Sequence, residues 1–310
     1  MIPFVSRVSQ EEKVKWISVL TKALPEEVIV PFESLNDVQK HACDVAIVAN
    51  PEPNDLLELP NLHWVHSVWA GVERMLAEID HPHFSIVRLV DPELANTMSE
   101  AVLAWTLFLH REMYAYQHQQ VRKEWRQRPM VRAQDRRIGV LGLGELGKTS
   151  ALRLKNNGFT VSGWSRSAKN ITGIQCFHGQ EGLYELLQQS DILICLLPLT
   201  TQTKGILNDV SLACLPMNAS VINFARGAII DDDALLIALD KQLSHAVLDV
   251  FAQEPLLVDH AYWTHPQVSV LPHISAPTHP ESASQIVAKH IRAYRALGEV
   301  PLAVDLKKGY

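Results

Sequence analysis

The amino-acid sequence predicts an α/β protein of two domains in which strands and helices alternate. Three observations support this fold class. Short apolar runs typical of buried strands alternate with amphipathic helical segments along the chain. A glycine-rich turn near the middle of the chain joins one such run to a helical segment. The length of 310 residues suggests about two domains.

The first part of the chain contains five apolar runs that predict strands, with helical segments between them. Gln10–Ala23 is the clearest of these helices. The predicted strands are Ile2–Ser6, Val28–Pro31, Val45–Ala49, Trp64–Val68 and Ile86–Val90. Thr97-Met98-Ser99-Glu100 then has the spacing of a capping box, a signal for the start of a helix. The helical pattern after it predicts one long helix from Thr97 to about Lys123.

The next apolar run ends in a G-x-G-x-x-G turn that opens into a helical pattern. In this setting Gly142 allows a tight turn, Gly144 lets backbone approach a pyrophosphate, and Gly147 lets the helix pack closely on its strand. The first amides of the helix, including those of Glu145 and Leu146, lie at the positive end of its dipole and can bind phosphate. Three glycines alone are a weak signal, but the flanking strands and helix predict a dinucleotide site.

Six apolar runs in this second part predict a complete dinucleotide-binding, or Rossmann, sheet. They are Ile138–Leu141, Thr160–Trp164, Ile192–Leu196, Val221–Phe224, Ala246–Phe251 and Val268–Leu271. A last helix is predicted at Glu281–Leu297. We therefore expect a Rossmann domain at residues 97–280 and a second domain formed by residues 1–96 and 281–310.

The residues after the second of these strands indicate which dinucleotide is bound. An NAD site usually has an Asp or Glu about 20 residues past the glycines, where it binds the ribose hydroxyls. Ser165, Arg166 and Ser167 occupy this place, with Lys169 beyond them and no carboxylate. Arg166 can pair with a 2′-phosphate, and the hydroxyls can donate to it. An ordinary polar loop is the alternative explanation, but the residues favour NADP(H) over NAD(H).

Three successive strand ends in the second domain carry an arginine, a glutamate and a histidine: Arg226, Glu254 and His273. Open α/β sheets bind ligands at the carboxyl ends of their strands, so we expect these side chains to share one site. The guanidinium would hold a carboxylate, the imidazole would exchange a proton, and the glutamate would orient the imidazole and stabilise its charged form. Each residue alone has a structural explanation, but together they suit the reduction of a carbonyl beside a carboxylate.

The chain resembles the D-isomer-specific 2-hydroxyacid dehydrogenases over essentially its whole length. The segments that carry this resemblance are Asn223-Phe224-Ala225-Arg226-Gly227, Leu248-Asp249-Val250-Phe251 with Glu254-Pro255, and Pro272-His273-Ile274. Within the family, Trp164-Ser165-Arg166-Ser167 and the loop Ser67-Val68-Trp69-Ala70-Gly71-Val72 are most similar to the short glyoxylate/hydroxypyruvate reductases of the A type.

This resemblance implies a flavodoxin-like α/β substrate-binding domain, with Arg226, Glu254 and His273 as the catalytic set. Substrate would contact Arg226, His273 and the amides of Ala70 and Gly71. The cofactor-binding residues would be Gly142, Gly144, Glu145, Leu146, Gly147, Ser165, Arg166, Ser167, Leu197, Pro198, Thr200, Ala225 and Asp249. Of these, Asp249 would contact the nicotinamide carboxamide.

Two further expectations concern Trp69 and the partner of this chain. Trp69 adjoins the carboxylate loop and would narrow the substrate pocket. Family members are commonly homodimers joined through the nucleotide domains. The segment Thr97–Lys123 is a candidate for that contact because of four aromatic residues, Trp105, Phe108, Tyr114 and Tyr116.

Composition argues against other protein classes. The net charge of −6 leaves no basic footprint for nucleic acid, and no apolar run approaches the roughly 18 residues that cross a membrane. No secretory signal is visible, and four scattered cysteines suit a reducing compartment, so we expect a cytoplasmic protein. His81-Pro82-His83 lacks further ligands with suitable spacing, and no metal site is expected.

The sequence thus predicts an NADPH-dependent reductase of small 2-oxo acids, acting on glyoxylate and hydroxypyruvate. Phosphoglycerate-, lactate- and erythronate-phosphate-type dehydrogenases are alternatives within the family. The absence of a regulatory domain after Leu297 and of a basic cluster for a substrate phosphate disfavours the first and third. A non-catalytic nucleotide-sensing protein with the same fold is the alternative from another class.

Overall fold

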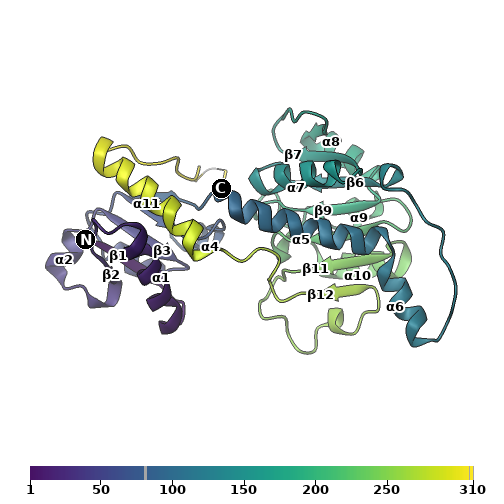
Figure 1. Cartoon of the computed structure of the whole chain (residues 1–310), viewed down its shortest axis with the longest axis horizontal. Helices are drawn as coiled ribbons and strands as arrows, with labels where there is room; N and C mark the ends of the chain where they lie inside the picture. Colours follow the sequence, from purple (N-terminus) through teal and green to yellow (C-terminus); the bar gives the residue numbers. More distant parts are fainter. Residues whose placement is uncertain (80–81, 307, 310) are drawn as a thin grey trace. The chain divides into compact units, whose positions relative to one another are not determined.

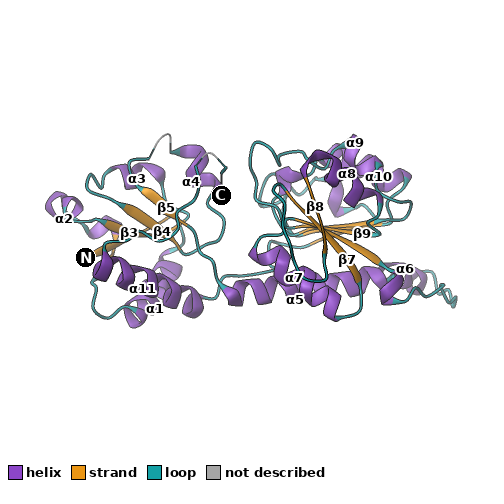
Figure 2. Cartoon of the chain, turned by 90° about the horizontal axis from the view of Figure 1, so that it is seen from above, coloured by secondary structure: helices purple, strands orange, loops and turns teal. Residues whose placement is uncertain are grey.

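A computed structural model of the chain describes residues 1–79, 82–306 and 308–309. The chain divides into two compact units, one made of Met1–Glu93 with Thr278–Tyr310 and one made of Leu94–Pro277. Each unit contains one parallel sheet, with helices on both of its faces (Figures 1 and 2). The predicted α/β class is therefore confirmed.

The first unit has a five-stranded sheet in the order β2-β1-β3-β4-β5, the order of flavodoxin-like folds. Its strands are β1 (Ile2–Ser6), β2 (Ile29–Pro31), β3 (Val45–Ala49), β4 (Trp64–Ser67) and β5 (Ser85–Val87). Its helices are α1 (Gln10–Ala23), α2 (Asp37–His41), α3 (Pro53–Leu57), α4 (Glu73–Glu78), α11 (Pro280–Leu297) and the 3₁₀ turn η1 (Phe32–Ser34). The helix predicted at Gln10–Ala23 is confirmed, and Ser9 with Glu12 forms its capping box.

The second unit has a seven-stranded sheet in the order β12-β11-β10-β9-β6-β7-β8, which is the Rossmann order with one additional strand. Its strands are β6 (Arg137–Leu141), β7 (Thr160–Ser165), β8 (Gln175–His178), β9 (Ile192–Cys195), β10 (Ser220–Asn223), β11 (His245–Leu248) and β12 (Val268–Val270). Its helices are α5 (Pro92–His110), α6 (Met113–Val121), α7 (Glu145–Asn156), α8 (Gly179–Gln188), α9 (Asp209–Ala213) and α10 (Asp232–Lys241), with 3₁₀ turns η2 (Ala133–Asp135), η3 (Gly227–Ile229) and η4 (Ala261–Trp263).

Both faces of the inner strands of the seven-stranded sheet are buried, which explains why β6 and β9 are mostly apolar rather than alternating. Successive strand residues point to opposite faces: Val140 packs with α5 and α7, whereas Leu141 packs with α8, α9 and α10. Figure 2 shows these two helix layers on either side of the sheet. All neighbouring strands are parallel, so their carboxyl ends lie along one edge.

The prediction of one helix from Thr97 to Lys123 is wrong at both ends. Helix α5 begins at Pro92, where the preceding Asp91 accepts the N–H of Glu93 through Oδ1 at 2.9 Å. An acidic cap followed by proline is a strong helix start, and it lies upstream of the apparent capping box. The helix then ends at His110, and Glu112 has a left-handed backbone (φ 51°) that separates α5 from α6.

Two strand predictions also need correction. The seventh strand, β8, was not expected because Gln175-Cys176-Phe177-His178 is an edge strand that is only partly buried and has no continuous apolar pattern. The strand predicted to reach Phe251 ends at Leu248. Val250 and Phe251 are apolar but belong to a loop at the carboxyl edge of the sheet. Apolar character alone therefore does not show where the hydrogen bonding between strands ends.

Candidate active site

The glycine turn between β6 and α7 has the geometry that the sequence predicts. Gly142 has φ +98°, and a Cβ on it would lie 2.7 Å from the carbonyl oxygen of Leu196. A Cβ on Gly147 would lie 1.7 Å from the carbonyl oxygen of Gly142. A side chain at Gly147 would push α7 away from the turn, and one at Gly142 would collide with the chain that follows β9, so both positions require glycine.

Gly144 differs, because a Cβ there would meet no atom within 4 Å. It is the N-cap residue of α7, and no side chain of the described residues caps this helix. The first N–H groups of a helix have no partner within it, so those of Glu145, Leu146 and Gly147 remain as donors at the start of α7. The open space and these donors suit a pyrophosphate. The chain therefore fits a dinucleotide at this turn.

The loops after β7 and β9 lie beside the glycine turn. The N–H of Gly142 donates to the carbonyl oxygen of Trp164 at 2.9 Å, and the N–H of Leu196 donates to that of Leu141 at 2.8 Å. Leu197, Pro198 and Thr200 follow directly in the second of these loops. There Thr203 Oγ1 donates to the carbonyl oxygen of Pro198 at 2.6 Å and accepts the N–H of Thr200 at 2.8 Å.

Ser165, Arg166 and Ser167 form the turn at the end of β7. Ser165 is buried, and its hydroxyl donates to the carbonyl oxygen of Ser167 at 2.8 Å. Arg166 is exposed, and its Nη1 donates to Gln202 Oε1 at 3.3 Å. Ser165 therefore stabilises the turn itself. Gln202, which the sequence analysis did not single out, contributes to the position of the guanidinium.

The loop that carries Arg226 is held by a buried asparagine at the end of β10. Asn223 Oδ1 accepts the N–H of Ala225 at 3.2 Å, and its Nδ2 donates to the carbonyl oxygen of Arg226 at 3.1 Å. A Cβ on Gly227 would lie 1.9 Å from the carbonyl carbon of Phe251. This close approach packs the Arg226 loop against the chain that follows β11, and only glycine permits it.

His273 and Glu254 are in direct contact. His273 Nδ1 lies 2.8 Å from Glu254 Oε2, and Glu254 Oε1 accepts the N–H of Phe251 at 3.0 Å. The side chains are 53% and 37% exposed, so both carboxylate and imidazole lie at the surface of this edge. With Nδ1 engaged by the carboxylate, Nε2 is the ring nitrogen that can exchange a proton with a substrate.

Asp249 lies beneath this pair. It is 2% exposed, and its oxygens accept the N–H groups of Ile274 at 2.7 Å and Ser275 at 2.9 Å. The sequence analysis named Asp249 only for a cofactor contact and missed these bonds. Residues 274 and 275 are remote from 249 in the chain, so no local pattern indicates them.

The loop after β4 belongs to the first unit. The hydroxyl of Ser67 accepts the N–H of Trp69 at 3.0 Å, and the carbonyl oxygen of Trp69 accepts the N–H of Leu89 at 3.1 Å. Trp69 is partly buried against the core of its unit, and Ala70 and Gly71 are partly exposed. These bonds give the loop a defined shape. The preceding His66 is buried, which lowers its pKa to about 4.

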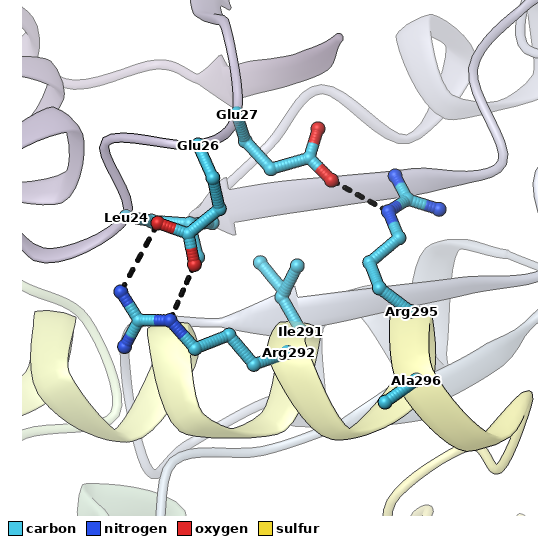
Figure 3. Close-up of a pocket in the computed structure, with 7 residues that line it drawn as sticks. All are labelled: Leu24, Glu26, Glu27, Ile291, Arg292, Arg295 and Ala296. Carbon is cyan, nitrogen blue, oxygen red and sulfur yellow. Dashed lines mark hydrogen bonds and ion pairs between the residues drawn. The ribbon is translucent and has the colours of Figure 1, made fainter.

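A hollow on the first unit lies between α11 and the connection from α1 to β2 (Figure 3). Its charged side chains are already paired. Arg292 binds both carboxylate oxygens of Glu26, and Arg295 Nε lies 2.5 Å from Glu27 Oε1. These ion pairs attach α11 to the N-terminal part of the unit, so the hollow is explained by packing rather than by ligand binding.

None of the helices in the described part of the chain is long and apolar enough to cross a membrane. Within residues 1–79, 82–306 and 308–309, no group of His, Cys, Asp and Glu has the arrangement of a metal site. His81 of the His81-Pro82-His83 segment lies outside the described residues.

Comparison with known proteins agrees with the predicted family. Residues 103–275 match the model of the D-isomer specific 2-hydroxyacid dehydrogenase, NAD binding domain. A glyoxylate/hydroxypyruvate reductase A of Yersinia enterocolitica is 40% identical over 306 residues, covering 96% of this chain and 97% of that protein.

Two solved structures share the whole fold. A D-isomer specific 2-hydroxyacid dehydrogenase of Xanthobacter autotrophicus Py2, in complex with NADPH and MES, has a TM-score of 0.93 and 35% identity and covers 100% of this chain and 99% of its own. An NADPH-dependent glyoxylate/hydroxypyruvate reductase of Sinorhizobium meliloti, in complex with NADP and sulfate, has a TM-score of 0.88 and 32% identity, with the same coverage. This chain belongs to the D-isomer specific 2-hydroxyacid dehydrogenase family.

Proposed function

We propose that this chain is an NADPH-dependent reductase that converts glyoxylate to glycolate and hydroxypyruvate to D-glycerate. The observation that carries this proposal is the contact of His273 Nδ1 with Glu254 Oε2 at 2.8 Å. This contact lies at the carboxyl edge of the seven-stranded sheet, and the glycine turn at the end of β6 has the geometry of a dinucleotide-binding turn. The names of the Yersinia and Sinorhizobium relatives support the substrate class.

The proposed roles follow from the chemistry of the side chains. Bound NADPH supplies a hydride from nicotinamide C4 to the keto carbon of the substrate. The imidazolium of His273 donates the Nε2 proton to the keto oxygen, and Glu254 orients the ring and stabilises its charged form. The guanidinium of Arg226 polarises the keto oxygen and pairs with the carboxylate of the substrate.

We assign the cofactor preference to the turn after β7. Arg166 is exposed there, no carboxylate occupies the turn, and the solved relatives from Xanthobacter and Sinorhizobium were determined with NADPH and NADP. A guanidinium in this position pairs with the 2′-phosphate that distinguishes NADPH from NADH.

The experiment is to measure kcat/KM for glyoxylate with NADPH and with NADH. We expect a clear preference for NADPH, and Arg166→Asp should reduce it by about 10- to 100-fold, because a charged hydrogen bond contributes about 1.5–3 kcal/mol. Lys241→Asp, an equal change of charge at an exposed position on α10, is the matched control and should keep the preference. Equal efficiency with both cofactors would reject the NADPH assignment. Tight NADPH binding without turnover of any 2-oxo acid would favour a nucleotide-sensing protein.

We also propose that the chain forms a homodimer through its nucleotide-binding unit. Trp105, Phe108 and Tyr114 pack against the core of their own unit. The surface available for a partner is the end of α6 with the long connection to β6, which projects from this unit in Figure 1. Val121 is 83% exposed and Trp125 is 100% exposed, so a partner that covers them would remove apolar surface from water. Light scattering should give the mass of a dimer, and Trp125→Glu should shift it toward that of a monomer.

A further inference from the structure

The buried carboxylate of Asp249 connects the end of β11 to the chain that follows His273. Both of its oxygens are used, each by one of two consecutive backbone amides, those of Ile274 at 2.7 Å and Ser275 at 2.9 Å. The residue is 2% exposed, so water does not compete for these bonds. Hydrogen bonds from backbone amides to an ionised carboxylate are among the stronger ones in proteins.

The backbone of His273 needs this support. It has φ +54°, in the left-handed region that residues with a Cβ rarely adopt. Such a conformation persists only where surrounding contacts determine it. Here the contacts come from both sides: the N–H of Leu271 donates to the carbonyl oxygen of Leu248 at 2.9 Å, and Asp249 binds the two amides after His273.

The imidazole is held by the same segment of chain. Glu254, which contacts His273 Nδ1, is itself bound at its second oxygen by the N–H of Phe251, two residues after Asp249. Residues 248–254 therefore determine both the backbone of His273 and the direction of its ring. Without the bonds to residues 274 and 275, His273 could relax toward ordinary backbone angles and turn its ring away from Glu254.

We propose that Asp249 is a positioning residue for proton transfer, which holds His273 in the conformation that pairs its imidazole with Glu254. The inference rests on the proposed function, in which His273 is the proton donor. It differs from the carboxamide contact that the family resemblance implies. A carboxamide contact acts on cofactor affinity, whereas a positioning role acts on the rate once the cofactor is bound.

The test compares Asp249→Asn with the unmodified enzyme. Asparagine keeps the size of the side chain but replaces one acceptor oxygen by an NH₂ group, so one backbone amide loses its partner. We expect kcat for glyoxylate reduction at saturating NADPH to fall about 10- to 100-fold, the scale of a small misplacement of a catalytic group. The Kd of NADPH, measured by fluorescence titration, should change less than about threefold. Without cofactor, the amides of residues 274 and 275 should exchange hydrogen faster.

Asp191→Asn is the matched control. Asp191 Oδ2 also accepts a backbone N–H, that of Arg137 at 2.8 Å, but at the amino edge of the same sheet. This variant should be less stable with unchanged kcat. If Asp249→Asn does not fold, Asp249→Glu, which keeps the carboxylate but displaces it by one methylene group, replaces it and should show the same fall in kcat.

A loss of NADPH affinity in Asp249→Asn with unchanged kcat and unchanged exchange would overturn the positioning role. Unchanged kcat and unchanged affinity would overturn it as well. His273→Ala in the same assay separates this result from the proposed function: near-normal turnover in that variant rejects His273 as the proton donor, whatever Asp249 does.

Discussion

The two edges of the seven-stranded sheet each carry a histidine, and the surroundings of these two histidines are opposite in character. At the carboxyl edge, His273 is 53% exposed and lies 2.8 Å from the carboxylate of Glu254. At the amino edge, His245 is 3% exposed, and the charged residues at the starts of β6 and β9, Arg137 and Asp191, are paired with each other at 2.6 Å. At the carboxyl edge these ionisable groups are open to solvent, whereas at the amino edge they are buried or paired with each other.

His245 illustrates how the amino edge suppresses charge. Its Nε2 lies 2.9 Å from Ser269 Oγ, and its ring stacks on Tyr114 with ring centroids 4.5 Å apart. Burial, followed by the neighbouring His118 and His265, lowers the pKa of His245 to about 4. The ring is therefore neutral near pH 7. The surroundings of His245, rather than its residue type, therefore keep it from acting as an acid near pH 7.

The largest expected effect comes from removing the histidine of the carboxyl edge. His273→Ala should lower kcat for glyoxylate reduction by about 10²–10⁴-fold, the usual contribution of a general acid, with little change in NADPH affinity. His245→Gln, the control from the amino edge, should leave kcat within about twofold because that ring is remote from the proposed chemistry. Steady-state kinetics on both variants test this difference between the two edges. Comparable losses of kcat in His273→Ala and His245→Gln would contradict it.

The next effect concerns stability at low pH. An unfolded histidine takes up a proton below about pH 6.5, but folded His245 does so only below about pH 4, so the free energy of unfolding falls as pH decreases through this range. The loss should reach at most about 3 kcal/mol. His245→Gln cannot titrate, and its melting temperature should decline less between pH 6.5 and 4.5. Parallel declines would show that His245 is not buried in its neutral form.

Glu254→Gln should have a smaller effect on turnover than His273→Ala. Glutamine keeps a hydrogen-bond partner for His273 Nδ1 but removes the negative charge beside the ring that donates the proton in the proposed reaction. We expect kcat for glyoxylate reduction to fall about 10-fold with little change in the Kd of NADPH, as measured by steady-state kinetics and fluorescence titration. An unchanged kcat would mean that Glu254 only orients the ring.

The smallest expected effect lies at the carboxyl edge of the other sheet, in the loop after β4. Trp69→Ala should improve the relative kcat/KM for phenylpyruvate over glyoxylate, by about 10-fold, if the indole narrows the pocket. Ser67→Ala, which removes the hydroxyl bound to the N–H of Trp69, is a milder perturbation of the same loop. Unchanged relative efficiencies in Trp69→Ala would limit its role to packing.

Much of this fold and its candidate site follows from the sequence alone, because the signals are local. Apolar runs predict strands buried on both faces. The glycine turn can be recognised from the sequence because Gly142 and Gly147 each satisfy a short-range steric requirement. Glu254 and His273, which are in contact, could be grouped in advance because parallel strands bring their carboxyl ends to one edge.

Only the tertiary structure decided the rest. Helix α5 could have begun at the cap provided by Asp91 or at the apparent capping box that starts at Thr97, and the structure uses Asp91. The edge strand β8 forms because it pairs with β7 and not because of its own composition. Asp249 binds amides 25 and 26 residues away, and burial of His245, whose ring stacks on Tyr114 of α6, lowers its pKa. These contacts join segments distant in sequence. Their energies depend on burial and geometry that exist only after the layers have packed, so no local pattern encodes them.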